Sequence, residues 1–160
     1  MTNTILQLLS ALSTELKVIL IAAMPIIELR GAIPVGIGLG MSPLHAGILG
    51  FLGSLIPVPF ILFGIRPVFN YLKKTKRFKN FVEKITHKSM KKSDKIQRYG
   101  AWGLLIFVAI PLPGTGVWSG SLIAALLDMR FKWAFPAITV GNAIAGFLIM
   151  TLSYGVFRLI

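Results

Sequence analysis

The stretch from Pro25 to Pro34, PIIELRGAIP, constrains the fold of this chain more than any other. It places Glu28 and Arg30 inside an apolar run, residues 18–39, that is long enough to enter a bilayer. Two prolines and two charges make this run a poor continuous spanning helix. Broken backbone at membrane depth is tolerated only where it is buried in protein or lines a polar cavity. We therefore expect the stretch to point into a site.

The composition is that of an integral membrane protein. Hydrophobic residues make up 55% of the chain and charged residues 14%, with a mean hydropathy of +0.79, whereas soluble domains average about 45–50% and 25%. The net charge is +12, but twelve of the 17 lysines and arginines lie between Arg66 and Arg98. A basic block between two apolar regions is typical of a cytoplasmic loop that contacts anionic lipid. We expect a multi-pass protein of the inner (plasma) membrane, with membrane lipids and not nucleic acid as partners.

The hydrophobic pattern predicts a single all-α membrane domain, residues 1–160, with four parts. These are an amphipathic N-terminal helix, a first repeat, a basic amphipathic cytoplasmic connector and a second repeat, over residues 1–17, 18–65, 66–100 and 101–160. Each repeat begins with an interrupted apolar element and ends with a continuous segment long enough to span. The interrupted elements are residues 18–39 and 101–127, and the continuous segments are residues 44–65 and 133–157.

Two local matches indicate the repeat. Ala23-Met24-Pro25 matches Ala109-Ile110-Pro111 at an offset of 86, and Gly53-Ser54 matches Gly141-Asn142 at an offset of 88. Paired interrupted segments are the best sequence indication of a transporter-type site. We interpret each interrupted element as a re-entrant helical hairpin, so that the halves form an inverted repeat with both hairpin tips at the bilayer midplane.

A topology in which all four elements cross the membrane stays open. Both termini lie outside in the hairpin topology and inside in the fully crossing one, yet each puts fourteen basic residues on the cytoplasmic side against two on the other. The positive-inside rule therefore does not separate them. The density of proline and glycine at the midpoints of the interrupted elements favours hairpins.

Glu28 and Arg30 are the first candidates for substrate or ion binding. An ionisable side chain at membrane depth costs several kcal/mol unless it is paired or hydrated, and it is a functional hypothesis by default. The planar guanidinium of Arg30 suits an anionic headgroup such as phosphate, and Glu28 could carry a coupling proton. The alternative is that the two charges pair only to lock the fold.

The remaining site candidates flank the two breaks. The prolines are expected to stop helices and to leave backbone groups that help bind an ion or headgroup. The candidates beside the breaks are Gly31, Pro34, Pro111, Pro113 and Gly114. Thr115 and Trp118 follow the second break and Asn142 lies in the last spanning segment, where they could line the same cavity. The more ordinary roles are packing for Trp118 and interhelical hydrogen bonding for Asn142.

The sequence lacks the residue patterns of a metal site and of the common enzyme active sites. Neither histidine has metal-ligand neighbours, and no Ser/His/Asp arrangement or paired carboxylates occur. We therefore expect no metal, no cofactor and no enzymatic activity. We also expect a homodimer, because so few helices cannot enclose polar groups alone.

The motifs PIIELRGAIP at residues 25–34 and PLPGTG at residues 111–116 resemble those of the small multidrug export family of prokaryotic membrane proteins. More distantly, the interrupted elements resemble those of the DedA superfamily, whose members have two re-entrant hairpins and are implicated in moving polyprenyl phosphates or phospholipids between leaflets. This resemblance implies that Glu28 takes the role of the acidic residue in the first hairpin. The arginines of the second hairpin have no counterpart between Phe107 and Val117, unless Arg30 substitutes for them.

We predict a transporter that moves an anionic or amphipathic small molecule or lipid carrier, such as a polyprenyl phosphate or phospholipid, with coupling to protons. One alternative is a multidrug exporter of cationic amphiphiles, in which Glu28 is the counter-charge. The other is a non-transporting membrane scaffold held together by Glu28 and Arg30.

Overall fold

The structure, a computed structural model, is all-helical in the part of the chain that it describes, residues 13–74, 80, 83, 84, 87, 98–112 and 114–159. Within these residues two helical stretches are long and apolar enough to cross a membrane, Pro43–Ile65 and Phe131–Val156. They match the two continuous segments predicted from the sequence. The predicted amphipathic helix falls largely outside the described residues, as does much of the basic connector.

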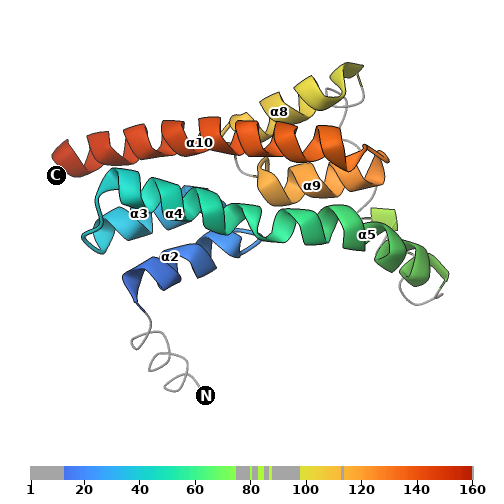
Figure 1. The fold of residues 1–160 in the computed structure, drawn as a ribbon, viewed down its shortest axis with the longest axis horizontal. Coiled ribbons are helices and arrows are strands. Elements are labelled where there is room, and N and C mark those ends of the chain that lie inside the picture. Colours follow the sequence, from blue (N-terminus) through green and yellow to red (C-terminus); the bar gives the residue numbers. More distant parts are fainter. Residues whose placement is uncertain are drawn as a thin grey trace, which may run out of the picture. The chain divides into compact units, whose positions relative to one another are not determined.

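The chain divides into two compact units, whose helices are labelled in Figure 1. Unit 1 contains the chain up to Ser54 and from Gly146 onward, and unit 2 contains Leu55–Ala145. In the described residues, the helices of unit 1 are α2 (Thr14–Ala23), α3 (Glu28–Gly38), most of α4 (Pro43–Leu55) and the last turns of α10 (Phe131–Leu159). Those of unit 2 are α5 (Pro57–Lys74), α8 (Ala101–Ala109), α9 (Val117–Leu126) and the first turns of α10.

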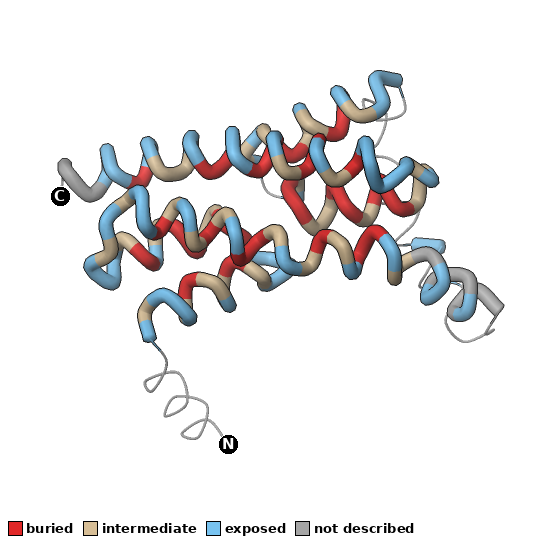
Figure 2. The backbone as a smooth tube through the Cα atoms, in the orientation of Figure 1, coloured by how far each residue is buried: buried red, intermediate tan, exposed pale blue. Residues whose placement is uncertain are grey.

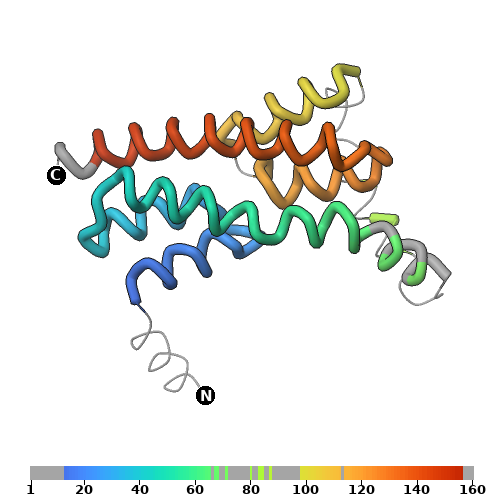
Figure 3. Tube along the Cα trace, in the orientation of Figure 1, coloured from blue at the N-terminus to red at the C-terminus, as the bar shows by residue number. Residues whose placement is uncertain are grey.

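In unit 1, α2 and α3 form a pair of short helices that pack against each other. The trace turns back on itself between them (Figure 3). A Cβ on Gly36 of α3 would lie 3.1 Å from Val18 Cγ2 of α2, so the two helices are in close contact. With 10 and 11 residues, each is about 15 Å long, which is half of the about 30 Å of hydrocarbon in a bilayer. Neither helix can cross a membrane alone.

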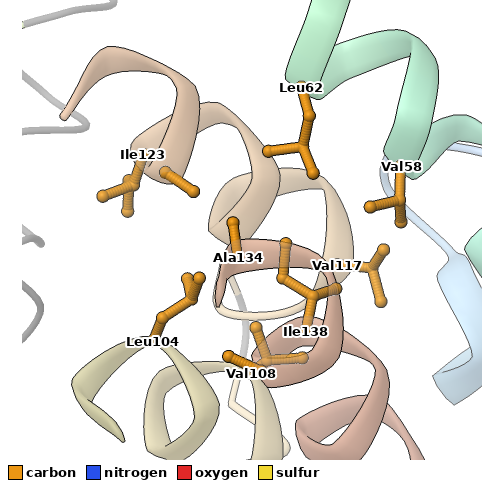
Figure 4. Close-up of a cluster of buried hydrophobic side chains, with 10 residues drawn as sticks. Val58, Leu62, Leu104, Val108, Val117, Ile123, Ala134 and Ile138 are labelled. Atoms are coloured by element: carbon orange, nitrogen blue, oxygen red, sulfur yellow. The ribbon is translucent and has the colours of Figure 1, made fainter. Parts of the chain in front are cut away.

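Unit 2 contains a similar pair, α8 and α9, packed with α5 and the start of α10. Most of α9 is buried, as the tube coloured by burial shows (Figure 2). Apolar side chains from all four helices form one cluster, which includes Val58, Leu62, Leu104, Val108, Val117, Ile123, Ala134 and Ile138 (Figure 4). The core of this unit therefore depends on residues from both candidate spans.

Helices α3 and α9 end in the same turn, at an offset of 88 residues. The Met41 amide donates to the Gly36 carbonyl at 3.0 Å, and the Met129 amide donates to the Ala124 carbonyl at 3.0 Å. The residue before each methionine is left-handed, with φ of +89° and +56°. This is the geometry of a Schellman-type helix end. The next helices, α4 and α10, then begin at positions that also differ by 88.

Each candidate span approaches the first helix of the short pair before it at a glycine. A Cβ on Gly53 would lie 2.7 Å from the Ile19 carbonyl oxygen, and one on Gly141 would lie 2.6 Å from the Leu105 carbonyl oxygen. Real Cβ atoms essentially never come this close to backbone. Both positions therefore require glycine, because the obstacle is main chain and cannot move as a side chain does.

We expect Gly53→Ala to lower the free energy of unfolding by about 1–3 kcal/mol, since the added methyl forces α4 away from α2. Gly64→Ala is the matched control, because a Cβ there meets nothing within 4 Å, and it should stabilise α5 by about 0.4–1 kcal/mol. Thermal unfolding of both variants in detergent micelles measures the difference. Equal shifts in the two variants would contradict the close contact at Gly53.

Candidate functional site

The first break lies between α2 and α3 and is held by its own backbone. Met24 precedes a proline and is extended, with φ −72° and ψ 141°, as expected for that position. Its amide donates to the Ile21 carbonyl at 3.2 Å, and the Glu28 amide donates to the Met24 carbonyl at 3.1 Å. The side chain of Ile26, in the middle of the break, is 93% exposed. The turn thus places Glu28 at the first position of α3.

Glu28 and Arg30 form an oppositely charged pair of unequal accessibility. The Glu28 side chain is 5% exposed, Arg30 is half-buried, and the two charges interact electrostatically. The positive end of a helix dipole favours the Glu28 carboxylate and disfavours the Arg30 guanidinium in the same turn. The buried acid therefore balances a cation that is in part accessible.

The backbone of Glu28 is left-handed, with φ +51°. An L-residue pays about 1–2 kcal/mol in this region, which glycine enters freely. The residue 88 positions later is Gly116, whose φ is +130°. Strained residues persist where the surroundings hold them, and they cluster at functional sites. A glutamate at a position suited to glycine is a candidate for function on this ground as well.

Gly31 and Pro34 shape α3 beside the charged pair. A Cβ on Gly31 would overlap Ile27 Cγ2, so a larger residue here would force the Ile27 side chain to move. The prediction that Pro34 stops a helix is wrong, because it lies inside α3. Proline removes one hydrogen bond, the one to the Arg30 carbonyl four residues earlier, and the burial of Ile33 on this helix helps to keep the helix intact.

The second break, between α8 and α9, is tied by Thr115. Its Oγ1 lies 2.7 Å from the Ile110 carbonyl oxygen and 2.8 Å from that of Leu112, and its single hydrogen is donated to one of them. The Leu112 amide donates back to Oγ1 at 3.3 Å. The exposed Gly114 has φ +78°, and Pro113 lies outside the described residues. Thr115 therefore holds the loop together.

Trp118 and Asn142, like Pro111 and Thr115, belong to unit 2. Trp118 is half-buried in the first turn of α9. Asn142 is 1% exposed in α10 and adjoins the glycine that contacts α8. The structure thus places Glu28, Arg30, Gly31 and Pro34 together on α3, and the other candidates around α9 and α10. Substrate contacts by the residues of unit 2 stay predictions.

Ser121 is a buried polar residue that sequence reasoning missed. It is 0% exposed, and among the described residues its Oγ has no hydrogen-bond partner. The only sequence signal is a serine in the apolar run VWSGSLIAAL, and serine is too common in membrane helices to be singled out.

No group of three side chains able to hold a metal ion occurs in the described residues.

Two candidate spans and two pairs of short helices, in a chain of mean hydropathy +0.79, indicate a helical membrane protein. A sequence model of the family described as "Putative small multi-drug export protein" matches residues 28–148. The chain belongs to this family, whose name indicates a transporter rather than an enzyme. No curated protein matches the chain, and no solved structure matches it. The more distant similarity to the DedA superfamily stays a prediction.

The left-handed backbone of Glu28 predicts that glycine is more stable than alanine at position 28, which is the reverse of the usual order in a helix. Glu28→Gly should be more stable than Glu28→Ala by about 1–2 kcal/mol, because both remove the carboxylate and only glycine relieves the strain. In an ordinary helix position alanine is the more stable of the two by about 1 kcal/mol. Unfolding of the two variants in micelles measures this. Asp128 is exposed and left-handed, with φ +56°, and serves as the matched position. There too the glycine variant should be more stable than the alanine variant. A Glu28→Ala variant more stable than Glu28→Gly would contradict the left-handed geometry.

Proposed function

We propose that this protein is a transporter of an anionic or amphipathic small molecule or lipid carrier, such as a polyprenyl phosphate or phospholipid. The observation that supports it is the unequal exposure of the charged pair, with Glu28 at 5% and Arg30 half-buried. The accessible charge at the break is a cation, and it suits an incoming anion. The buried carboxylate is poorly placed as the first contact of a cationic substrate.

Arg30 and Glu28 act in turn in this proposal. The guanidinium binds the phosphate or carboxylate of the substrate through two parallel hydrogen bonds. In the empty site Glu28 supplies the opposite charge, since a buried cation left alone is costly. A bound anion competes with Glu28 for Arg30, and the displaced carboxylate then takes up a proton from water. Substrate binding and protonation of Glu28 are thereby coupled.

We propose that both short helix pairs are re-entrant hairpins and that the chain is an inverted repeat in the inner (plasma) membrane. The helix lengths support the hairpins, because 9 to 11 residues reach about half of the hydrocarbon core. The shared turn and glycine contact, found at offsets of 86 to 88, support the repeat. The basic connector lies in the cytoplasm. The homodimer expected from the sequence stays a prediction.

An exporter of cationic amphiphiles is the second candidate, suggested by the words "multi-drug export" in the family description, which name no substrate charge. Glu28 would then bind the cation, and Arg30 would repel it. The two candidates make opposite predictions for Arg30, because its removal abolishes binding of an anion and strengthens binding of a cation.

We expect Arg30→Ala to insert and fold normally yet to lower the transport rate of a fluorescent phosphatidylglycerol in reconstituted vesicles by at least about tenfold, since a hydrogen bond to a charged group contributes about 1.5–3 kcal/mol. Glu28→Gln should also lower the transport rate, and the transport that remains should no longer depend on a proton gradient. Arg130→Ala, which removes an exposed arginine at the start of α10, is the matched control and should transport normally.

Normal flux in both Arg30→Ala and Glu28→Gln would overturn the proposal. Faster efflux of a cationic dye by Arg30→Ala would instead support the exporter. The scaffold alternative is tested by exchanging the two residues. A Glu28→Arg, Arg30→Glu double variant that folds and behaves as wild type, beside single variants that do not fold, would support a purely structural pair.

A further inference from the structure

A hollow of about 360 Å³ lies in unit 1, between the start of α4 and the end of α10. Its lining residues are Ser42, Pro43, Leu44, Met150, Thr151 and Tyr154. None of them is charged. The Thr151 hydroxyl donates to the Phe147 carbonyl of its own helix at 2.8 Å, so it offers little polarity to the hollow. The occupant that fits this lining is an apolar group.

In unit 2, the positions 88 residues away from two lining residues of the hollow carry aromatic side chains that pack on one another. Phe63 stacks on Phe131 with ring centroids 4.7 Å apart, and Phe131 stacks on Phe135 at 5.1 Å. The residues 88 positions away from these three are Thr151, Pro43 and Gly47. Where unit 2 has three stacked rings, unit 1 therefore has two small side chains, a glycine and a hollow.

The chain fills this hollow only in part. Met150 lies over Gly47, since a Cβ on that glycine would be 3.2 Å from Met150 Sδ. Leu44, which lines the hollow, is 65% exposed, and on the same two helices Ile48 and Leu152 are 50% and 62% exposed. On a membrane-spanning segment such side chains contact lipid. The hollow is thus continuous with a surface that lipid chains cover.

We propose that this hollow binds one acyl chain of a phospholipid. Its volume of about 360 Å³ falls in the range of about 300–1,000 Å³ typical of small-molecule sites. The hollow lies where both candidate spans have an end. The half-exposed Tyr154 suits the headgroup level there. Because the basic segment after Ile65 marks the cytoplasm, the lipid comes from the outer leaflet.

Filling the hollow with the aromatic side chains of unit 2 tests the proposal. The wild-type protein, purified in mild detergent, should retain one phospholipid per chain in native mass spectrometry. Thr151→Phe and Pro43→Phe, which copy Phe63 and Phe131, should lose it. Leu152→Phe is the matched control, one residue away and outside the lining, and should retain it. Equal retention by all four proteins would overturn the proposal, as would an unchanged lipid count with a change in oligomeric mass in the filled variants.

A second measurement needs no substitution in the hollow. A phosphatidylethanolamine that carries a photoreactive diazirine on its acyl chain is added to the wild-type protein in vesicles, and the labelled peptides are identified by mass spectrometry. Adducts should concentrate on Leu44, Met150 and Tyr154 above the level on Leu152. Labelling spread evenly over the exposed apolar residues of both helices would overturn the proposal.

Discussion

Backbone that leaves a helix at membrane depth needs hydrogen-bond partners in the protein or in a water-filled cavity. Both breaks of this chain make such hydrogen bonds within their own backbone and side chains. In the first, the Met24 and Glu28 amides donate to carbonyls three and four residues earlier. In the second, which is three residues longer, the Leu112 amide donates to the Ile110 carbonyl at 2.9 Å, and the Thr115 hydroxyl donates to the carbonyl of Ile110 or of Leu112. The breaks are therefore built into the fold, and charged groups can be placed beside them.

The charged pair depends on this arrangement. Glu28 begins α3, where the helix dipole favours a carboxylate, and its negative charge offsets that of Arg30 in the same turn. The left-handed backbone of Glu28 turns the chain into α3 at the cost of strain. Close glycine contacts, such as that of Gly53 with Ile19, hold the spans against the short helices. Backbone geometry, packing and charge thus support one another at the first break.

Features that are local in sequence were predictable, and features that depend on tertiary contacts were not. The segments 44–65 and 133–157 were found from apolar length alone and are confirmed as candidate spans over Pro43–Ile65 and Phe131–Val156. The end of α2 before Pro25 follows from the restriction that proline places on its neighbour. Pro34 was wrongly expected to end a helix, since burial along α3 outweighs one lost hydrogen bond. The conformation of Glu28 and the hollow beside Thr151 have no sequence signal of their own, because each depends on backbone geometry and on packing between segments far apart in the chain.

The re-entrant path of α2 and α3 is the central claim, and cysteine accessibility tests it most directly. The sequence contains no cysteine, so Ser13→Cys and Ser42→Cys provide unique thiols at the two ends of the pair, and Lys84→Cys provides one in the basic connector. A membrane-impermeant maleimide is added to one side of oriented vesicles. The account predicts that positions 13 and 42 react from the same side and position 84 from the opposite side. Reaction of positions 13 and 42 from opposite sides would contradict it.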